Sequence, residues 1–237
     1  MYLAMFGLLI VLLFAMMSMD QPVSNLKYYQ VLDYFRNGEV EEYQIDYNDG
    51  TLTLKLEGQD QLVDYQLASI TRQLVNITKG VTYTRFVRKG IIKVYEDGSE
   101  FPIGKGVVLH ESDHDAAAIL TSGIMVDEAL KAYEALQAEG ISVRVIDLFT
   151  WKPLDEELVI KAARETGAIV TAENHNVTCG LGSVVANCLA KNAPTIQEFV
   201  GVQDRFGQVG PQDFLMDEYG LRSVNIVAAV KKVISRK

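Results

Sequence analysis

A polar tripeptide in the second half of the chain carries residue types that could do chemistry. Glu173, Asn174 and His175 directly follow the apolar, β-branched run Ala168–Ala172, and a Gly-Leu-Gly-Ser sequence then opens a run with apolar residues at helical spacing. This order predicts a strand, a loop over residues 173–179 and a helix. Parallel strands of an open α/β sheet deliver such side chains to a ligand crevice at their carboxyl ends. The alternative is that Glu173 and His175 only hydrogen-bond a loop or a subunit contact.

A second pattern, H-E-x-x-H, is formed by His110, Glu111 and His114. On a helix this spacing places two imidazoles on one face for zinc and leaves the glutamate to activate water. Here Val107–Leu109 predicts a strand, and the residues after Glu111 have turn composition. We therefore expect no helix and no metal site at this pattern.

The composition limits the function classes. The chain has 237 residues, is 49% apolar, and carries a formal charge of −9 with a pI near 4.9. This length suits one large domain or two small ones with an ample core. The basic residues between Arg85 and Lys93 are too few for a nucleic-acid footprint, so no nucleic-acid partner is expected. Cys179 and Cys188 cannot form a disulfide framework, and both are expected to be buried or half-buried thiols.

The first seventeen residues, 1–17, are an uninterrupted apolar run. At ~1.5 Å per residue this run would nearly cross a ~30 Å hydrocarbon core. A cleavable signal peptide normally has a basic start and small residues at its cleavage site, and neither is found here. We therefore predict an uncleaved transmembrane anchor over residues 1–19, with a buried core helix as the alternative.

A small α+β domain is predicted for residues 26–75. Apolar residues recur at helical spacing over 26–35, the residues on both sides of Asn48-Asp-Gly alternate as a hairpin, and residues 62–67 could supply a third strand. The sequence Leu26-Lys-Tyr-Tyr-Gln-Val-Leu-Asp-Tyr-Phe, preceded by the apolar run, resembles the N-terminal anchor and extracytoplasmic domain of the FtsH family of membrane AAA zinc metalloproteases. The sequence shows no second span, P-loop or protease domain, so this resemblance implies only an anchor and its small domain.

Strands and helices alternate through residues 81–237. Strands are predicted at 91–95, 107–109, 116–121, 142–148, 168–172 and 196–202, and helices at 126–136, 152–166, from 180 onward, at 216–221 and from Ser223, which we expect to cap the last helix. Such alternation predicts an α/β fold with a mostly parallel sheet and helices on both faces, preceded by one transmembrane helix and the small α+β domain.

The same region carries a second resemblance. In order, the chain contains Tyr83-Thr-Arg-Phe-Val-Arg-Lys, Leu120-Thr-Ser-Gly-Ile-Met-Val, Ile169-Val-Thr-Ala-Glu-Asn-His and Asp204-Arg-Phe-Gly-Gln-Val-Gly. From about residue 81 to the end, these motifs are similar to the C-terminal domain of transketolases, most of all the split, two-subunit kind.

The resemblance implies a function and a partner. Transketolases move a two-carbon ketol unit between sugar phosphates with thiamine diphosphate and a divalent metal, Mg²⁺. Their cofactor lies between two preceding domains from different chains, and the C-terminal domain helps the dimer form. The implied partner is a transketolase N-terminal chain or a homodimer partner. Because no set of cofactor and metal ligands is visible, we expect no catalytic, cofactor-binding or metal residue in this chain alone.

The candidate interface loop consists of Glu173, His175, Asp204 and Arg205. Relatives usually have Glu-Glu-His where this chain has Glu-Asn-His, and a glycine at the position of Cys179. Both departures alter the loop that would meet a partner.

Two hypotheses for the function follow. The first is a transketolase-family C-terminal domain that is inactive alone and requires a partner with the thiamine diphosphate domains. The alternative is a non-catalytic membrane-anchored adaptor, or a chimeric product, related to the FtsH N-terminal region. The join near Lys79 and Gly80 is either a true fusion or a misassembly of two coding regions, and we favour the latter. The anchor predicts a single-pass membrane protein, whereas relatives of the C-terminal domain are cytoplasmic, and the side on which the α/β domain lies stays open.

Overall fold

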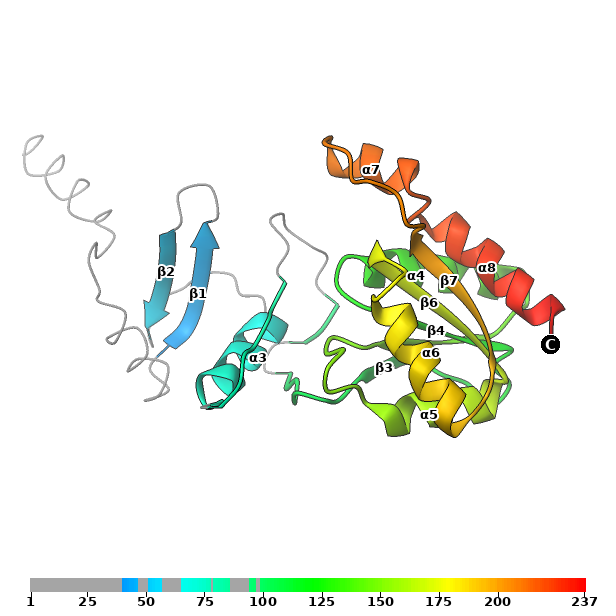
Figure 1. The fold of residues 1–237 in the computed structure, drawn as a ribbon, viewed down its shortest axis with the longest axis horizontal. Helices are drawn as coiled ribbons and strands as arrows, with labels where there is room; N and C mark the ends of the chain where they lie inside the picture. The colour runs from blue at the N-terminus through cyan, green and yellow to red at the C-terminus, as the bar shows by residue number, and fades with distance from the viewer. Residues whose placement is uncertain (1–39, 47–50, 57–64, 78, 86–93, 97–98) are drawn as a thin grey trace, which may run out of the picture. The chain divides into compact units, whose positions relative to one another are not determined.

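The structure of the chain is a computed structural model, which describes residues 40–46, 51–56, 65–77, 79–85, 94–96 and 99–237 (Figure 1). The chain divides into two compact units, residues 1–83 and 84–237. The predicted domain ranges 1–19, 26–75 and 81–237 remain predictions. The proposed anchor, the helix expected at 26–35 and the hairpin turn all lie outside the described residues.

The first unit contains a hairpin and a helix. Strands β1 (Val40–Asp46) and β2 (Thr51–Leu56) pair antiparallel, as the alternating pattern predicted. The predicted third strand at 62–67 is wrong, because α3 (Tyr65–Val75) begins inside it, and Ile70 and Leu74 recur at helical rather than alternating spacing. The helix is tied to β1 by Arg72, whose Nη2 donates to the Val40 carbonyl at 3.0 Å.

The predicted membrane localisation needs correction. Within the described part of the chain, no helix is both long enough and apolar enough to cross a membrane. Crossing takes about 20 apolar residues, and the longest described helix, α4 (Met125–Ala138), has 14 residues. The assignment as a single-pass membrane protein is contradicted by this finding and is withdrawn. Residues 1–19, on which it rested, are not among the described residues.

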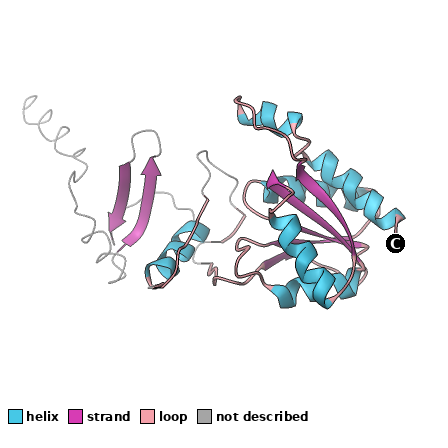
Figure 2. Cartoon of the chain, in the orientation of Figure 1, coloured by secondary structure: helices cyan, strands magenta, loops and turns pink. Residues whose placement is uncertain are grey.

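The second unit is built on a five-stranded sheet with the order β3-β5-β4-β6-β7. Strands β4 (Ala117–Thr121), β5 (Val143–Asp147), β6 (Ala168–Asn176) and β7 (Ile196–Val202) are parallel, and β3 (Val107–His110) joins one edge antiparallel to β5. Figure 2 shows helices flanking these strands. The predicted α/β class with a mostly parallel sheet is thus confirmed.

Alternate residues of the strands supply two separate cores. On one face, Ile119 and Val170 pack with α4 and with α8 (Ser223–Ser235). On the other, Leu120 and Ile169 pack with α5 (Glu156–Thr166) and α6 (Leu181–Asn192). Strands β4 and β5 are buried along their whole length, and β4 is accordingly almost entirely apolar, whereas β5 also buries Arg144 and Asp147.

Turn and cap residues set most helix ends. Asp155 caps α5 by accepting from the Leu158 amide at 3.2 Å, and Gly167 ends it in the left-handed conformation at φ 65°. The short helix predicted at 216–221 lies earlier, as α7 (Gln212–Glu218), with Pro211 at its N-cap. The last helix is capped by Arg222, and the predicted cap Ser223 is its first residue.

Strand β6 is longer than predicted. The sequence suggested that it ends at Ala172 and that residues 173–179 form a loop, yet the strand continues to Asn176. It continues because β7 remains its neighbour, with Asn176 opposite Val202 and the Val177 amide donating to the Val202 carbonyl at 3.0 Å. The predicted strand at 91–95 falls mainly outside the described residues, and Val94–Glu96 form no strand.

Candidate functional site at the carboxyl edge of the sheet

Glu173 is an internal residue. Its side chain is 1% exposed, and its carboxylate accepts from the Leu181 amide at 2.7 Å and the Gly182 amide at 2.8 Å. These two amides are in the first turn of α6, whose N-cap residue, Gly180, has no side chain to satisfy them. Burial raises the pKa of the Glu173 carboxyl above its ordinary value, although the two amide bonds act in the opposite direction. Glu173 therefore caps the start of α6 from inside the α/β unit.

Three glycines make room for this arrangement. A Cβ at Gly180 would lie 1.9 Å from Glu173 Oε2, and a Cβ at Gly201 would lie 3.0 Å from Glu173 Cγ. A Cβ at Gly182 would lie 2.5 Å from the Phe199 ring. The glycines thus let the start of α6 approach the ends of β6 and β7 as closely as the carboxylate requires.

His175 lies at the carboxyl edge with residues from other strand ends. Its ring packs edge-on against Trp151, with ring centroids 5.8 Å apart, and its Nδ1 lies 3.0 Å from the Asn176 carbonyl oxygen. Trp151 donates from Nε1 to Ser122 Oγ at 3.1 Å, and Arg85 donates from Nη1 to the Asn174 carbonyl at 3.1 Å. The edge therefore gathers side chains that follow β4, β5 and β6, as expected for this fold.

Asp204 and Arg205 begin a different feature. Asn176 Nδ2 donates to Asp204 Oδ1 at 3.1 Å, which ties Asp204 to the end of β6. Arg205 turns toward α7, where its Nη2 donates to Glu218 Oε1 at 2.5 Å and its guanidinium lies 5.3 Å from the centroid of the Tyr219 ring. Of the four predicted interface residues, Asp204 and Arg205 are exposed, His175 is half-buried and Glu173 is enclosed.

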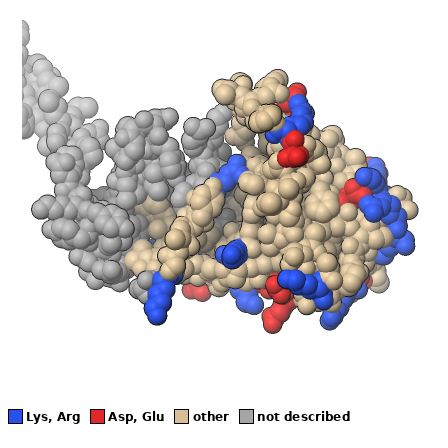
Figure 3. All heavy atoms as spheres, viewed as in Figure 1, with Lys and Arg blue, Asp and Glu red and all other residues tan. Residues whose placement is uncertain are grey.

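Residues 203–211 are here called the arm. The sequence motif at Asp204 lies in it, but the exposure of its apolar side chains was not predicted. Within it Phe206 is 99% exposed and Val209 is fully exposed. The arm is nevertheless held in place, because Tyr219 Oη donates to the Phe206 carbonyl at 2.9 Å and Gln208 Nε2 donates to Glu218 Oε1 at 3.2 Å. In Figure 3 the projection formed by this region is mostly tan, and charged side chains gather along one side of it. A fixed arm with exposed apolar side chains is typical of a protein-binding surface.

A half-buried tyrosine was also missed. Tyr95 donates from its hydroxyl to Asp147 Oδ2 at 2.6 Å, at the carboxyl end of β5, and packs edge-on against Phe101. Burial, followed by the charge of Asp147 and the hydrogen bond to it, raises the Tyr95 pKa far above its ordinary value. The phenol therefore stays protonated and serves as a fixed hydrogen-bond donor. No sequence motif marked this pair, which joins residues 52 positions apart.

The H-E-x-x-H pattern belongs to a structural network at the opposite edge. His110 ends β3 and stacks on Tyr133 with ring centroids 4.0 Å apart, and a turn follows, so the predicted absence of a helix is confirmed. Glu111 lies 3.8 Å from the Nε of Arg144. Among the described residues, no group of three or more His, Cys, Asp or Glu side chains is placed to hold a metal ion.

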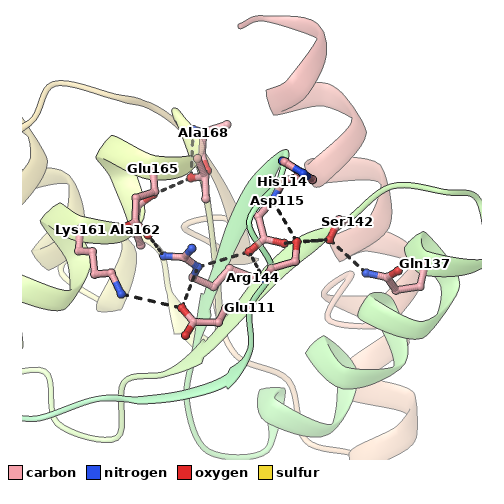
Figure 4. Close-up of polar contacts among 12 residues, drawn as sticks. Glu111, His114, Asp115, Gln137, Ser142, Arg144, Lys161, Ala162, Glu165 and Ala168 are labelled. Atoms are coloured by element: carbon pink, nitrogen blue, oxygen red, sulfur yellow. Dashed lines mark hydrogen bonds and ion pairs between the residues drawn. The ribbon is translucent and has the colours of Figure 1, made fainter.

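Arg144 is the centre of that network (Figure 4). The buried guanidinium donates from Nη1 to Glu165 Oε2 at 2.5 Å and from Nε to Asp115 Oδ2 at 3.4 Å. Asp115 also accepts from the Ser142 hydroxyl at 2.9 Å. Asp115 and Ser142 precede β4 and β5, so the network closes the amino edge of the sheet, away from His175.

Cys179 departs from its expected environment. Cys188 is buried as predicted, but Cys179 is exposed and has φ 67°, in the left-handed region that favours glycine. Its amide donates to Ser183 Oγ at 3.0 Å, which holds this turn at the start of α6.

The described residues do not fit thiamine diphosphate or its metal. Free amides at a helix start can hold a diphosphate, but the amides at the start of α6, at the carboxyl edge of the sheet, already donate to Glu173. A buried carboxylate at that place would repel an added phosphate. No cluster of metal ligands compensates within the described part of the chain.

Comparison with known proteins shows which family the chain resembles. Residues 104–226 match the family model described as "Transketolase, C-terminal domain". The chain is 44% identical to the 6-deoxy-6-sulfo-D-fructose transketolase subunit SqwH of Clostridium sp. (strain MSTE9) over 67% of the chain and 48% of that protein. It is 33% identical to the transketolase-like protein 2 of Mus musculus over 67% of the chain and 25% of that protein.

A solved structure agrees. The chain superposes on a split gene transketolase, described as an inactive beta4 tetramer, with a TM-score of 0.65 and 40% identity over 71% of this chain and 53% of that one. The match spans about half of the subunit from Clostridium and of this solved chain, and less of the mouse protein. These matches give no support to the FtsH-related adaptor, and the resemblance of residues 1–75 to FtsH remains a prediction. The chain belongs to the transketolase family, and its α/β unit is the C-terminal domain of that family.

Proposed function

We propose that this chain is the C-terminal part of a split transketolase and takes part in ketol transfer only together with a partner polypeptide that carries the thiamine diphosphate domains. The observation that carries the proposal is the pair of subunit relatives, each matched over about half its length. One of them is described as an inactive tetramer of beta subunits, which supports the view that a chain of this kind does not act alone.

The carboxyl edge of the sheet also supports the view that a partner chain binds the cofactor. Transketolase-family enzymes use thiamine diphosphate, and the cofactor with a divalent metal supplies the chemistry of moving a two-carbon unit between sugar phosphates. The start of α6, which could receive a phosphate, is taken by Glu173. The groups that hold the cofactor and Mg²⁺ are therefore expected on the partner.

The partner surface proposed here combines Asp204 and Arg205 of the predicted loop with Phe206 and Val209 of the arm. His175 lies near this surface at the carboxyl edge, and Glu173 supports it from inside. Exposed aromatic and aliphatic side chains on a fixed backbone lose little conformational freedom on binding, so they make effective contact residues. The partner is a transketolase-family polypeptide with the remaining domains.

A reconstitution experiment tests the function. The purified chain is assayed for ketol transfer between sugar phosphates with thiamine diphosphate and Mg²⁺, alone and after mixing with a transketolase N-terminal chain. We expect turnover only in the mixture, and no binding of thiamine diphosphate to the isolated chain by calorimetry. Turnover by this chain alone would disprove the proposal.

A second experiment tests the surface. Phe206→Ser and Val209→Ser should each weaken assembly with the partner by about tenfold or more, as for a central interface residue. The matched control is Val224→Ser, which removes an exposed apolar side chain from α8. Equal effects of all three substitutions in analytical ultracentrifugation would show that the arm is not the contact.

A further inference from the structure

The start of α6 is the place where a sheet of this topology would bind an anion. The helix follows the carboxyl end of β6, and its first amides point toward that edge, where the helix dipole favours negative charge. In this chain one side chain takes both amides, because Glu173 Oε2 accepts from Leu181 and Glu173 Oε1 accepts from Gly182. The two oxygens of a single carboxylate therefore do what two oxygens of a phosphate would do.

The carboxylate lies in an enclosed site that the sequence has shaped for it. Glu173 is 1% exposed, and glycines lie on two sides of it. A Cβ at Gly180 would come within 1.9 Å of Oε2, and a Cβ at Gly201 would come within 3.0 Å of Cγ. Any larger residue at Gly180 would expel the carboxylate. The site is thus complete without a ligand, and it has no room for one.

We propose that Glu173 is an internal substitute for a bound anion, a positioning residue that completes the start of α6 and keeps phosphate groups away from it. The proposal rests on the proposed function in one respect, since it explains why phosphate binding is left to the partner. Burial raises the Glu173 pKa, and the two amide bonds oppose this effect without outweighing it.

The bonds from Glu173 to the α6 amides also position the residues that follow it at the carboxyl edge of the sheet. The residue after Glu173 is Asn174, whose carbonyl accepts from Arg85, and the next is His175, which packs on Trp151. Because β6 is anchored to α6 through Glu173, these two contacts are fixed relative to the helix. Release of the carboxylate is expected to loosen both contacts.

Chemical rescue of Glu173→Ala in the full chain tests the proposal. The substitution leaves two inward amides and a space the size of a small carboxylate, which formate or acetate can fill. We expect a lower Tm for the variant, and a rise of roughly 3–6 °C for each tenfold increase of formate or acetate above its dissociation constant. Sodium chloride at the same ionic strength should not reproduce this rise. Wild type and Glu134→Ala, which loses an exposed carboxylate on α4, should show no specific response.

The result that would overturn the proposal is a folded Glu173→Ala variant whose Tm does not respond to either carboxylate. If the variant does not fold, the wild-type chain decides by NMR. The amide signals of Leu181 and Gly182 should not move when pyrophosphate is added, and movement of both would show that the helix start accepts phosphate. Neither measurement needs a partner chain, so failure of the reconstitution assay with intact rescue would refute only the proposed function.

Discussion

Replacing Gly180 by alanine should destabilise the α/β unit more than the same replacement at Gly182 or Gly201. The ideal Cβ would lie 1.9 Å from Glu173 Oε2 and 2.5 Å from the Asn176 carbonyl oxygen, far inside van der Waals contact. Backbone conformation is not the obstacle, because Gly180 has φ −93° and ψ −162°, which any residue can adopt. The cost therefore comes from space alone.

The magnitude follows from the bonds that must break. To admit the methyl group, the carboxylate has to leave the Leu181 and Gly182 amides, and each hydrogen bond to a charged group contributes about 1.5–3 kcal/mol. We expect the free energy of unfolding to fall by about 3–5 kcal/mol, a large share of the 5–15 kcal/mol typical of a domain. For a unit of this size the Tm should drop by roughly 6–20 °C.

Urea unfolding followed by circular dichroism gives the measurement, and Gly207→Ala is the matched control because a Cβ at Gly207 meets nothing within 4 Å. A double-mutant cycle with Glu173→Ala isolates the cause. The Gly180 substitution should cost at least about 2 kcal/mol less once the carboxylate is gone. Equal costs in both backgrounds, or a Gly180→Ala variant as stable as Gly207→Ala, would refute the reasoning.

Three further predictions concern residues elsewhere in the α/β unit. Arg144→Met should lower the free energy of unfolding by about 3–5 kcal/mol, because it leaves the buried Asp115 without its cation. Lys231→Ala, which breaks an exposed pair with Glu139, should cost under about 1 kcal/mol in the same denaturation assay. Cys179→Gly should raise the Tm slightly, by a net gain in stability of up to about 1 kcal/mol. Glycine adopts the left-handed backbone without strain, and its larger loss of conformational freedom on folding cancels part of this gain. A lower Tm would contradict the prediction. Burial raises the Glu198 pKa, but hydrogen bonds from Lys232 and Arg236 outweigh it and lower the pKa below its ordinary value of 4.5. The stabilisation from Glu198 is therefore present above that value and lost as the pH falls through the depressed pKa, so wild type and Glu198→Gln should converge in stability only in acid.

The order and type of the α/β elements could be predicted from the sequence because pattern and tertiary structure agree there. Strand β7 was predicted with its observed bounds, and Gly167 ends α5 as expected. The predictions fail where a distant group decides the local structure. Polar composition suggested a loop from Glu173, but Glu173 bonds to α6 and the pairing with β7 resumes at Asn176, so these residues stay in the strand.

The positions of two candidate residues in the fold were predicted, but their surroundings were not. The sequence located Glu173 and His175 at a strand end, yet it could not show that one is enclosed and the other packs on Trp151. Alternation along the chain gives no signal for such contacts between strand ends. The sequence contained the motif of the arm, but Phe206 and Val209 look like core residues in a sequence, so their exposure was not predicted.

In two helices of the α/β unit, amides at the helix start donate to glutamate side chains from other elements. Glu173 takes the first amides of α6, and Glu128 on α4 accepts from the Ser223 amide at 2.6 Å at the start of α8, across 95 positions of the chain. Neither contact can form before the sheet has assembled, so the first turns of both helices should become ordered late during folding. Removing either glutamate is then expected to speed unfolding while leaving the refolding rate nearly unchanged, which stopped-flow kinetics can measure.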